Sequence, residues 1–207
     1  MVTRSRFILA LVLLFSLSSA CFAEVEVPDP REAVGKTAER VLAELARDRD
    51  RYQTDDAALY DMARRLVVSQ FDLERTAQWV LARHWRGATA EQRQQFEDEF
   101  SRLMLRTYAL ALRSYDNETI EYLPLVMKPG SKKVMVKTKL VRDDGSKVTV
   151  DYRLILREDG WKVYDVVIEN VSMVITYRSE YSGIIESQGL DVLTQKLSER
   201  NRAALEK

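Results

Sequence analysis

The chain is poor in the side chains that most enzymes use for chemistry. Its 207 residues include one cysteine, Cys21, and one histidine, His84. A single cysteine cannot form an intramolecular disulfide, so the fold must be held by its hydrophobic core. The sequence has no G-x-S-x-G motif that would supply a nucleophile for His84. We therefore interpret His84 as a partly exposed helical residue. We therefore predict no catalytic residue and no metal-binding residue.

Nucleotide and nucleic-acid binding also lack support. The sequence has neither G-x-x-x-x-G-K-[ST] nor G-x-G-x-x-G, so no nucleotide cofactor is predicted, nor any other. Its 32 basic residues balance 32 acidic ones, whereas a nucleic-acid-binding surface favours a strong basic excess. The acidic pairs Asp55-Asp56 and Asp143-Asp144 fall in predicted turns, where aspartate bonds its own backbone.

The N-terminus has the pattern of an export signal. Arg4 and Arg6 precede an apolar run over residues 7–17, and small residues follow. That run is about 11 residues long, too short to span a membrane, which takes about 20. We predict a signal peptide over residues 1–23, a periplasmic protein that begins at Glu24, and a mature net charge of −2, from 30 basic and 32 acidic residues.

A lipoprotein signal is the alternative for the same segment. Small residues precede Cys21, as lipid attachment requires, but Ser18 stands where an apolar residue is usual. The mature chain contains no cysteine after signal cleavage at Ala23, and a lipid-anchored one after processing at Cys21.

Apolar residues spaced by three and four predict amphipathic helices in the first half. The first helix has Pro30 near its start, and the second follows a polar break over residues 48–56. The stripe of the first is Val34, Ala38, Val41, Leu42 and Leu45, and that of the second is Leu59, Met62, Ala63, Leu66 and Val67.

Two further helices are predicted before the chain changes character. A short one opens at Asp72 and closes near Gly87, a residue type that often ends helices in the left-handed conformation. Thr89 and Gln92 form a capping box for a long helix that runs to about Tyr115. Its inner stripe includes Phe96, Phe100, Leu103, Met104 and Tyr108.

The period then changes to that of an antiparallel sheet. Pro129-Gly130, Asp144-Gly145 and Asp159-Gly160 are turn signals between runs rich in valine, tyrosine and isoleucine. They predict four strands, near residues 118–127, 133–142, 147–157 and 161–170, with one apolar face. Helices follow over residues 173–186 and beyond Gly189. The fold class is therefore α+β, with an N-terminal helical layer packed on a curved four-stranded antiparallel sheet, C-terminal helices and an internal apolar cavity, as in nuclear-transport-factor-like folds. Residues 24–207 form one domain.

Three motifs carry a family resemblance. They are Phe71-Asp72; Trp85-Arg86 with Thr89, Glu91-Gln92-Arg93 and Phe96; and the segment from Trp161 to Val166, followed by Val171-Ser172 and Tyr177-Arg178-Ser179. In this order they resemble the MlaC family, also called toluene-tolerance proteins. Three positions depart from its pattern: the family tends to have Leu-Gly at Leu81-Ala82, Glu-Gly at Glu169-Asn170 and Asn-Tyr at Thr176-Tyr177. Asn170 can still adopt a positive φ.

The resemblance implies a monomeric periplasmic carrier that buries the acyl chains of a phospholipid. Its partners would be an inner-membrane ABC transporter with an MCE-domain subunit and an outer-membrane lipoprotein–porin complex, and its role would be to maintain outer-membrane lipid asymmetry. We expect a weak positive rim near the head group. The predicted ligand-binding residues are Phe100, Met104, Tyr108, Val136, Leu140, Val150, Tyr152, Leu154, Tyr177 and Tyr181.

Other functions stay open at this point. A hopanoid-type carrier would have the same apolar lining. An exported isomerase-type enzyme would use Asp165, which lies within a predicted strand, as a buried general base. The structural alternative for Asp165 is an ion pair, for which Arg178 is a candidate partner. A chaperone that grips apolar polypeptide is a third alternative.

Overall fold

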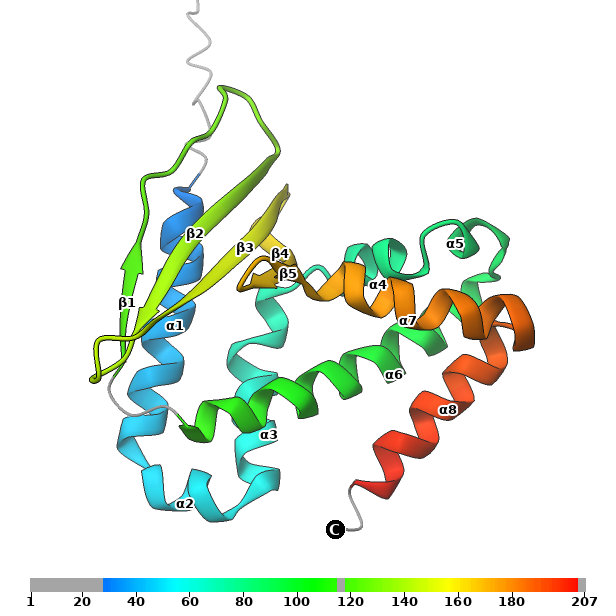
Figure 1. Cartoon of the computed structure of the whole chain (residues 1–207), viewed down its shortest axis with the longest axis horizontal. Coiled ribbons are helices and arrows are strands. Elements are labelled where there is room, and N and C mark those ends of the chain that lie inside the picture. Colours follow the sequence, from blue (N-terminus) through cyan, green and yellow to red (C-terminus); the bar gives the residue numbers. More distant parts are fainter. Residues whose placement is uncertain (1–27, 115–117, 205–207) are drawn as a thin grey trace, which may run out of the picture.

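The computed structural model describes residues 28–114 and 118–204 (Figure 1). The predicted signal peptide, Cys21, the start at Glu24 and the predicted helix end at Tyr115 lie outside the described residues. Helices and an antiparallel sheet follow one another along the chain, so the α+β class is confirmed. No helix within the described ranges is long and apolar enough to cross a membrane.

Three helices form the N-terminal part: α1 (Pro30–Arg47), α2 (Arg49–Thr54) and α3 (Asp56–Leu66). The carboxylate of Asp29 caps α1 by accepting a hydrogen bond from the backbone N–H of Arg31 at 2.8 Å, and Pro30 takes the first helical position. The helix α2 was not predicted, because its residues look like a polar loop. It buries Tyr52 alone.

The predicted third helix is in fact two helices. The short 3₁₀ turn η1 (Val68–Gln70) leads to α4 (Leu73–Leu81), which begins beside Asp72 as predicted, and then to α5 (His84–Gly87). The Asp72 carboxylate caps α4 by accepting a hydrogen bond from the Arg75 N–H at 2.9 Å. The break lies at Ala82, which has φ 48° and ψ −114°, a conformation that favours glycine. The helix α5 does end at Gly87, as predicted, but Gly87 does not have the positive φ that was expected there.

The long helix α6 (Ala90–Ala109) crosses the centre of the molecule. Its capping box is present as predicted: the Thr89 hydroxyl accepts from the Gln92 N–H at 3.1 Å, and the Gln92 amide accepts from the Thr89 N–H at 3.0 Å. The helix ends earlier than predicted, and a 3₁₀ segment, η2 (Leu110–Ser114), follows it.

The sheet contains five strands, each antiparallel to its neighbour, in the order β1-β2-β3-β4-β5. They are β1 (Thr119–Tyr122), β2 (Lys133–Val141), β3 (Lys147–Arg157), β4 (Gly160–Ile168) and β5 (Val171–Ser172). The predicted count of four missed β5, which has only two residues. Glu169 and Asn170, with φ of 48° and 66°, turn the chain back for it.

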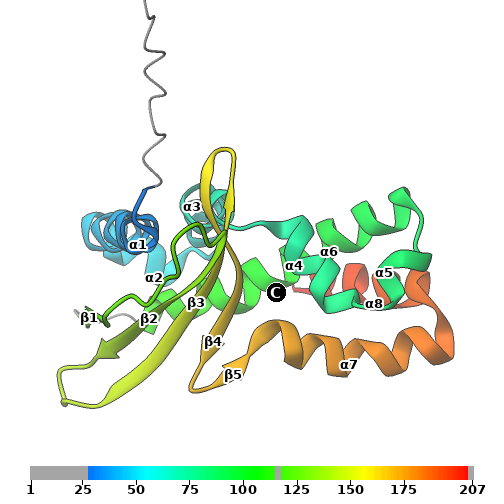
Figure 2. The same cartoon turned by 90° about the horizontal axis from the view of Figure 1, so that it is seen from above.

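The sheet folds over α1, and α2 and α3 lie next to α1, whereas α4, α5, α7 (Met173–Gln188) and α8 (Leu190–Ala203) extend to the side of the sheet (Figure 2). After β5 the chain enters α7, which packs on α4, and then α8, which packs on α6. Buried side chains form three separate clusters. The first joins α4 to α8 around Phe96, the second joins α1, α2 and α3 around Leu59, and the third lies on the inner face of the sheet around Leu154.

Candidate functional site

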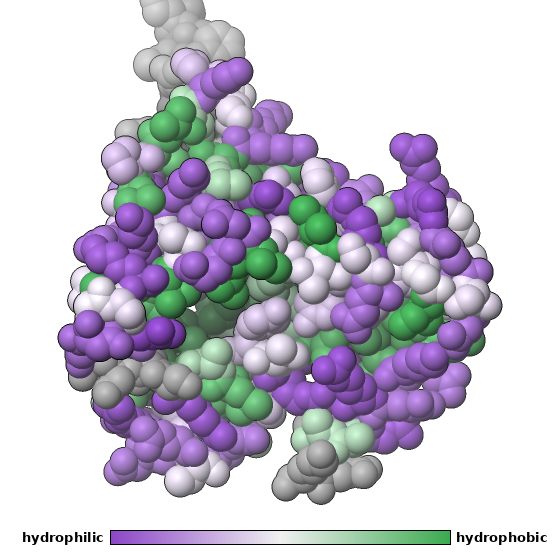
Figure 3. Space-filling view, viewed as in Figure 1, coloured by the Kyte–Doolittle hydropathy of each residue, from purple (hydrophilic) through white to green (hydrophobic). Residues whose placement is uncertain are grey.

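Two apolar cavities lie between the helices and the inner face of the sheet. The small cavity, about 220 Å³, is bounded by α3, α4, α6, β4 and the start of α7. The large cavity, about 560 Å³, is bounded by α1, η1, the end of α6 and strands β1 to β4. In a space-filling view the surface is hollowed beside the sheet, with hydrophobic atoms around the opening (Figure 3).

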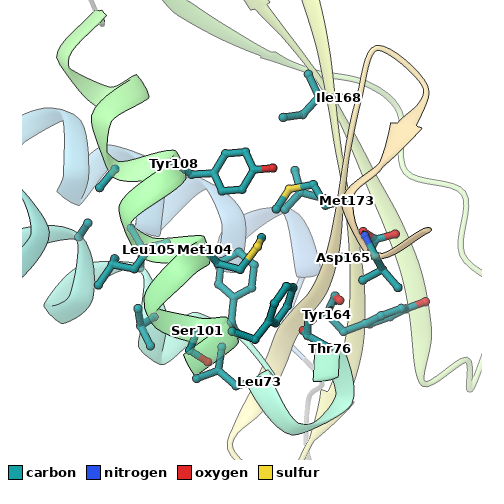
Figure 4. Close-up of a pocket in the computed structure, with 18 of the residues that line it drawn as sticks. Leu73, Thr76, Ser101, Met104, Leu105, Tyr108, Tyr164, Asp165, Ile168 and Met173 are labelled. Atoms are coloured by element: carbon teal, nitrogen blue, oxygen red, sulfur yellow. Dashed lines mark hydrogen bonds between the residues drawn. The ribbon is translucent and has the colours of Figure 1, made fainter. Parts of the chain in front are cut away.

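The two cavities share part of their walls. Five side chains border both spaces: Val67, Phe71, Tyr108, Leu112 and Ile168. Tyr108 reaches from α6 toward Ile168 and Met173 on the opposite side (Figure 4). The two spaces are therefore neighbouring chambers with a wall of side chains between them.

Two polar side chains on the wall of the small cavity, Thr76 and Tyr108, are already engaged within the protein. The Thr76 hydroxyl donates to the backbone oxygens of Asp72 at 2.9 Å and Tyr164 at 3.0 Å. Burial raises the pKa of the Tyr108 hydroxyl, which is hydrogen-bonded to Tyr177, so that phenol stays neutral. These groups leave a wall suited to an apolar ligand.

The large cavity is apolar along most of its length and charged at one end. Burial raises the pKa of Tyr152 to about 12, so its hydroxyl carries no charge at neutral pH. Arg142 and Glu118 line the cavity where β1 begins and β2 ends. Arg142 is exposed to solvent, so it marks a place where a polar part of a ligand can face water.

Asp165 is buried on β4, and its carboxylate holds the start of α7. It accepts hydrogen bonds from Arg153 at 2.8 Å, from the Ser172 hydroxyl at 2.7 Å and from the Val174 N–H at 3.1 Å. The predicted partner was wrong: Arg178 instead donates to the backbone oxygen of Trp79 at 2.8 Å. Arg153 takes the role because β3 pairs it directly with Asp165.

The interpretation of His84 as a partly exposed helical residue is confirmed. Its side chain is 19% exposed, and its Nε2 lies 3.4 Å from the Ser182 hydroxyl and 3.9 Å from Glu186. Both contacts use the same ring nitrogen, so Glu186 does not orient the ring as a base toward Ser182. No group of histidine, cysteine and carboxylate side chains within the described ranges is arranged to hold a metal ion.

Seven of the ten predicted ligand-binding residues line the cavities. They are Phe100, Met104, Tyr108, Leu140, Val150, Tyr152 and Leu154. The other three border neither cavity. Val136 is packed within the sheet cluster, and Tyr177 and Tyr181 contact Phe100 and Phe96 edge to face in the cluster between α6 and α7. These three side chains pack against close neighbours. Sequence periodicity shows that a side chain points inward, but it does not show whether that side chain meets a neighbour or a cavity.

Several lining residues were not predicted as such. Val34, Ala38, Val41 and Leu42 of α1 were predicted as the core stripe of a helix, yet they line the large cavity. Phe71, which separates the chambers together with Tyr108, belongs to a motif that carries the family resemblance. That motif was the available signal. Nothing in the periodicity singles out Leu112, Ile168 or Met173.

Comparison with known proteins bears on this pair of cavities. The family model described as MlaC protein matches residues 35–199, most of the chain. The chain belongs to the MlaC family. Within the MlaC family it is 26% identical over 181 residues to the toluene tolerance protein ttg2D of Pseudomonas putida, covering 87% of this chain and 84% of that protein.

Two further comparisons concern phospholipid. The intermembrane phospholipid transport system binding protein MlaC of Haemophilus influenzae is 25% identical over 193 residues, covering 91% of this chain and 90% of that protein. A phospholipid-binding protein from Ralstonia solanacearum, solved in complex with a phospholipid, superposes with a TM-score of 0.79 at 33% identity. That match covers 87% of this chain and all of the other.

Proposed function

We propose that this protein is a periplasmic phospholipid carrier that shields acyl chains in the two cavities. The observation that carries the proposal is the pair of adjoining apolar chambers in a chain that is 33% identical to a protein solved with a phospholipid. A lipid with two acyl chains needs an extended apolar space rather than a compact pocket. Two chambers that share a wall provide one.

The energetics of carriage suit an apolar lining with few polar anchors. Burying a methylene gains about 0.8 kcal/mol, so a two-chain lipid represents on the order of 20 kcal/mol of gross transfer free energy. A carrier must nearly match the bilayer, because a stronger site would not release its lipid. The uncharged phenols of Tyr108 and Tyr152 and the engaged Thr76 hydroxyl fit that requirement.

The head group belongs, in this proposal, at the charged end of the large cavity. Arg142 is the cation among the residues that line that cavity, and it is exposed. A single exposed arginine attracts a phosphate without enclosing it, in keeping with the weak positive rim expected from the sequence. The head group then stays in water while the acyl chains follow the apolar walls.

The predicted export signal and the family support a proposal for the location and the partners. We propose that residues 1–23 direct the chain to the periplasm. There it would pass lipids between an outer-membrane lipoprotein–porin complex and an inner-membrane ABC transporter with an MCE-domain subunit. This transfer would maintain the lipid asymmetry of the outer membrane. Support for this part of the proposal comes from a relative described as belonging to an intermembrane phospholipid transport system.

The test combines native mass spectrometry with solvent extraction of protein purified from a periplasmic extract. The wild type should carry phospholipid in near-stoichiometric amount. Val150→Trp places an indole in the large cavity, which Val150 lines. If it displaces about two lipid methylenes, binding weakens by about 1.6 kcal/mol, or roughly tenfold. Its free energy of unfolding should change by less than about 1 kcal/mol, because the ring enters open space.

A matched control separates cavity filling from damage to the fold. Val136 lies on the same face of the sheet, is 1% exposed and borders neither cavity. Val136→Trp should therefore overpack the core and lower stability by about 1–3 kcal/mol or more. The proposal fails if wild-type protein carries no phospholipid. The assignment of the cavity fails if Val150→Trp behaves like Val136→Trp and its folded fraction keeps a full lipid load.

A further inference from the structure

The loop between β1 and β2, residues 123–132, exposes apolar side chains at its tip. Val126 is 90% exposed and Met127 is 40% exposed, the former by far the most exposed of the large hydrophobic residues described. The loop projects from the end of the molecule where α1 begins (Figure 1). Exposing two adjacent apolar side chains on a projecting loop is unfavourable in water, so the tip calls for a function.

The loop is held in this conformation. Leu125, behind the tip, packs against the sheet cluster, and the Leu123 N–H bonds to the Lys137 oxygen at 2.9 Å. On the other side of the tip, the Ser131 N–H bonds to the Lys128 oxygen at 3.1 Å, closing a turn around Pro129 and Gly130. Val126 and Met127 are therefore presented outward by an anchored loop.

The chain segment that carries the tip has charge of one sign. Residues 123–141 contain five lysines and no carboxylate, in a chain whose net charge is zero. Within the described ranges, Lys128, Lys132 and Lys133 form no ion pair. Lys133 instead lies over the ring of Trp79 at 5.6 Å. The neighbouring β3–β4 turn contains two acids, Glu158 and Asp159, and Asp159 is paired with Lys162 at 2.8 Å.

We propose that this loop docks the protein on an anionic phospholipid bilayer, with Val126 and Met127 in the interfacial region and Lys128 and Lys132 at the head groups. Apolar side chains flanked by lysines match the two contributions that hold proteins at such surfaces. A protein partner fits less well, because two side chains on a convex tip provide far less than the roughly 800 Å² that one side of a stable interface buries.

Docking through this loop would bring the cavity close to the bilayer. Leu125 packs in the cluster that includes Val34, Leu154 and Trp161, and these three residues also line the large cavity. The docking surface is nevertheless distinct from the lipid site, since neither Val126 nor Met127 lines a cavity. The proposed docking on a bilayer would therefore stand even if the cavities carried a ligand other than phospholipid.

The experiment is co-flotation of the full mature protein with vesicles. One set contains phosphatidylcholine alone, and the other contains equal parts of phosphatidylcholine and phosphatidylglycerol. Wild-type protein should float with the anionic vesicles in low salt, and less in high salt. Lys128→Gln with Lys132→Gln should weaken this binding about 25-fold, from about fivefold per lysine. Lys133 is left in place because it contacts Trp79.

Apolar variants test the tip itself. Val126→Asn with Met127→Gln should weaken binding by about tenfold or more. The matched control is Val171→Asn with Ile175→Gln, which changes an exposed apolar pair away from the loop. Val171 on β5 is 59% exposed and Ile175 in the first turn of α7 is 51% exposed, and this variant should float like wild type. The proposal is overturned if the wild type binds anionic vesicles only at background level. That result is the one expected of a loop that docks on a protein instead. Equal loss in the control and tip variants also overturns the proposal.

Co-purified lipid keeps this inference separate from the proposed carrier function. The tip variant should retain the full lipid load of the wild type, and Val150→Trp should still float. A tip variant that loses its cargo as well as vesicle binding would contradict the separation of the two surfaces.

Discussion

Changing Asp165 to asparagine tests the network that fastens α7 to the sheet. The Asp165 side chain is 1% exposed and receives three hydrogen bonds. Asparagine keeps the shape and can still accept from the Val174 N–H and pair with the Ser172 hydroxyl. Its amide nitrogen, however, would face the Arg153 guanidinium, donor against donor.

The size of the loss follows from what Arg153 can do next. A charge-assisted hydrogen bond contributes about 1.5–3 kcal/mol, and breaking a fully buried pair costs about 3–5 kcal/mol. Arg153 is 30% exposed and can turn toward water, so the lower range applies. We expect the free energy of unfolding to fall by about 2 kcal/mol, which lowers Tm by roughly 4–8 °C for a domain of this size.

Urea denaturation and calorimetry measure the change, and a double-mutant cycle locates it. Asp165→Asn combined with Arg153→Gln should show a coupling of about 1–2 kcal/mol. Asp159→Asn is the matched control, because Asp159 pairs with Lys162 while its side chain is 69% exposed. That variant should lose less than about 0.5 kcal/mol. Lipid carriage should survive in the folded Asp165→Asn protein.

Two outcomes would contradict the reasoning. A loss for Asp165→Asn no larger than the loss for Asp159→Asn would mean that the network does not hold α7. A well-folded Asp165→Asn protein that loses a ketone or lactone isomerase activity present in the wild type would instead revive the enzyme hypothesis.

Two further changes should stabilise the protein. Ala82→Gly should raise the free energy of unfolding by about 1 kcal/mol, because Ala82 has φ 48° and ψ −114°, while the same change at the exposed helical residue Ala43 should lower it by about 0.5–1 kcal/mol. Tyr181→Phe should be neutral or stabilising by about 1 kcal/mol, since its buried hydroxyl has no hydrogen-bond partner, whereas Tyr177→Phe removes a bond to Tyr108 and should destabilise. Urea denaturation checks all four, and a destabilised Ala82→Gly or Tyr181→Phe would show the local argument to be wrong.

The elements that the sequence predicted well are those with a local cause. The capping box at Thr89 and Gln92, the helix start at Asp72 and the turns that separate β2, β3 and β4 depend on neighbouring residues alone. The first strand was predicted too long, since β1 ends at Tyr122, just before Pro124, which has no N–H to continue a ladder.

Errors arose where distant contacts decide the outcome. A helix break at Ala82 is unexpected for alanine, and only the family's preference for glycine there pointed to it. Asp165 pairs with Arg153 because of the register between β3 and β4. That register cannot be read from the positions of Asp165 and Arg178 in the sequence. Whether an apolar stripe packs closely or lines a cavity depends on what faces it. Tyr181 was predicted to line the cavity and lies in a packed cluster, whereas Val34 was predicted as core and lines the large cavity.

The division of the interior into three clusters has a consequence for the unloaded protein. Each cluster, around Phe96, Leu59 and Leu154, closes on its own side chains at the margin of the cavities. Delivery of a ligand therefore leaves the contacts within each cluster in place, and members that line a cavity, such as Leu154 and Phe100, lose a neighbour only on their cavity side. A protein that must pass repeatedly between full and empty states gains from keeping its structural support outside the space that it empties.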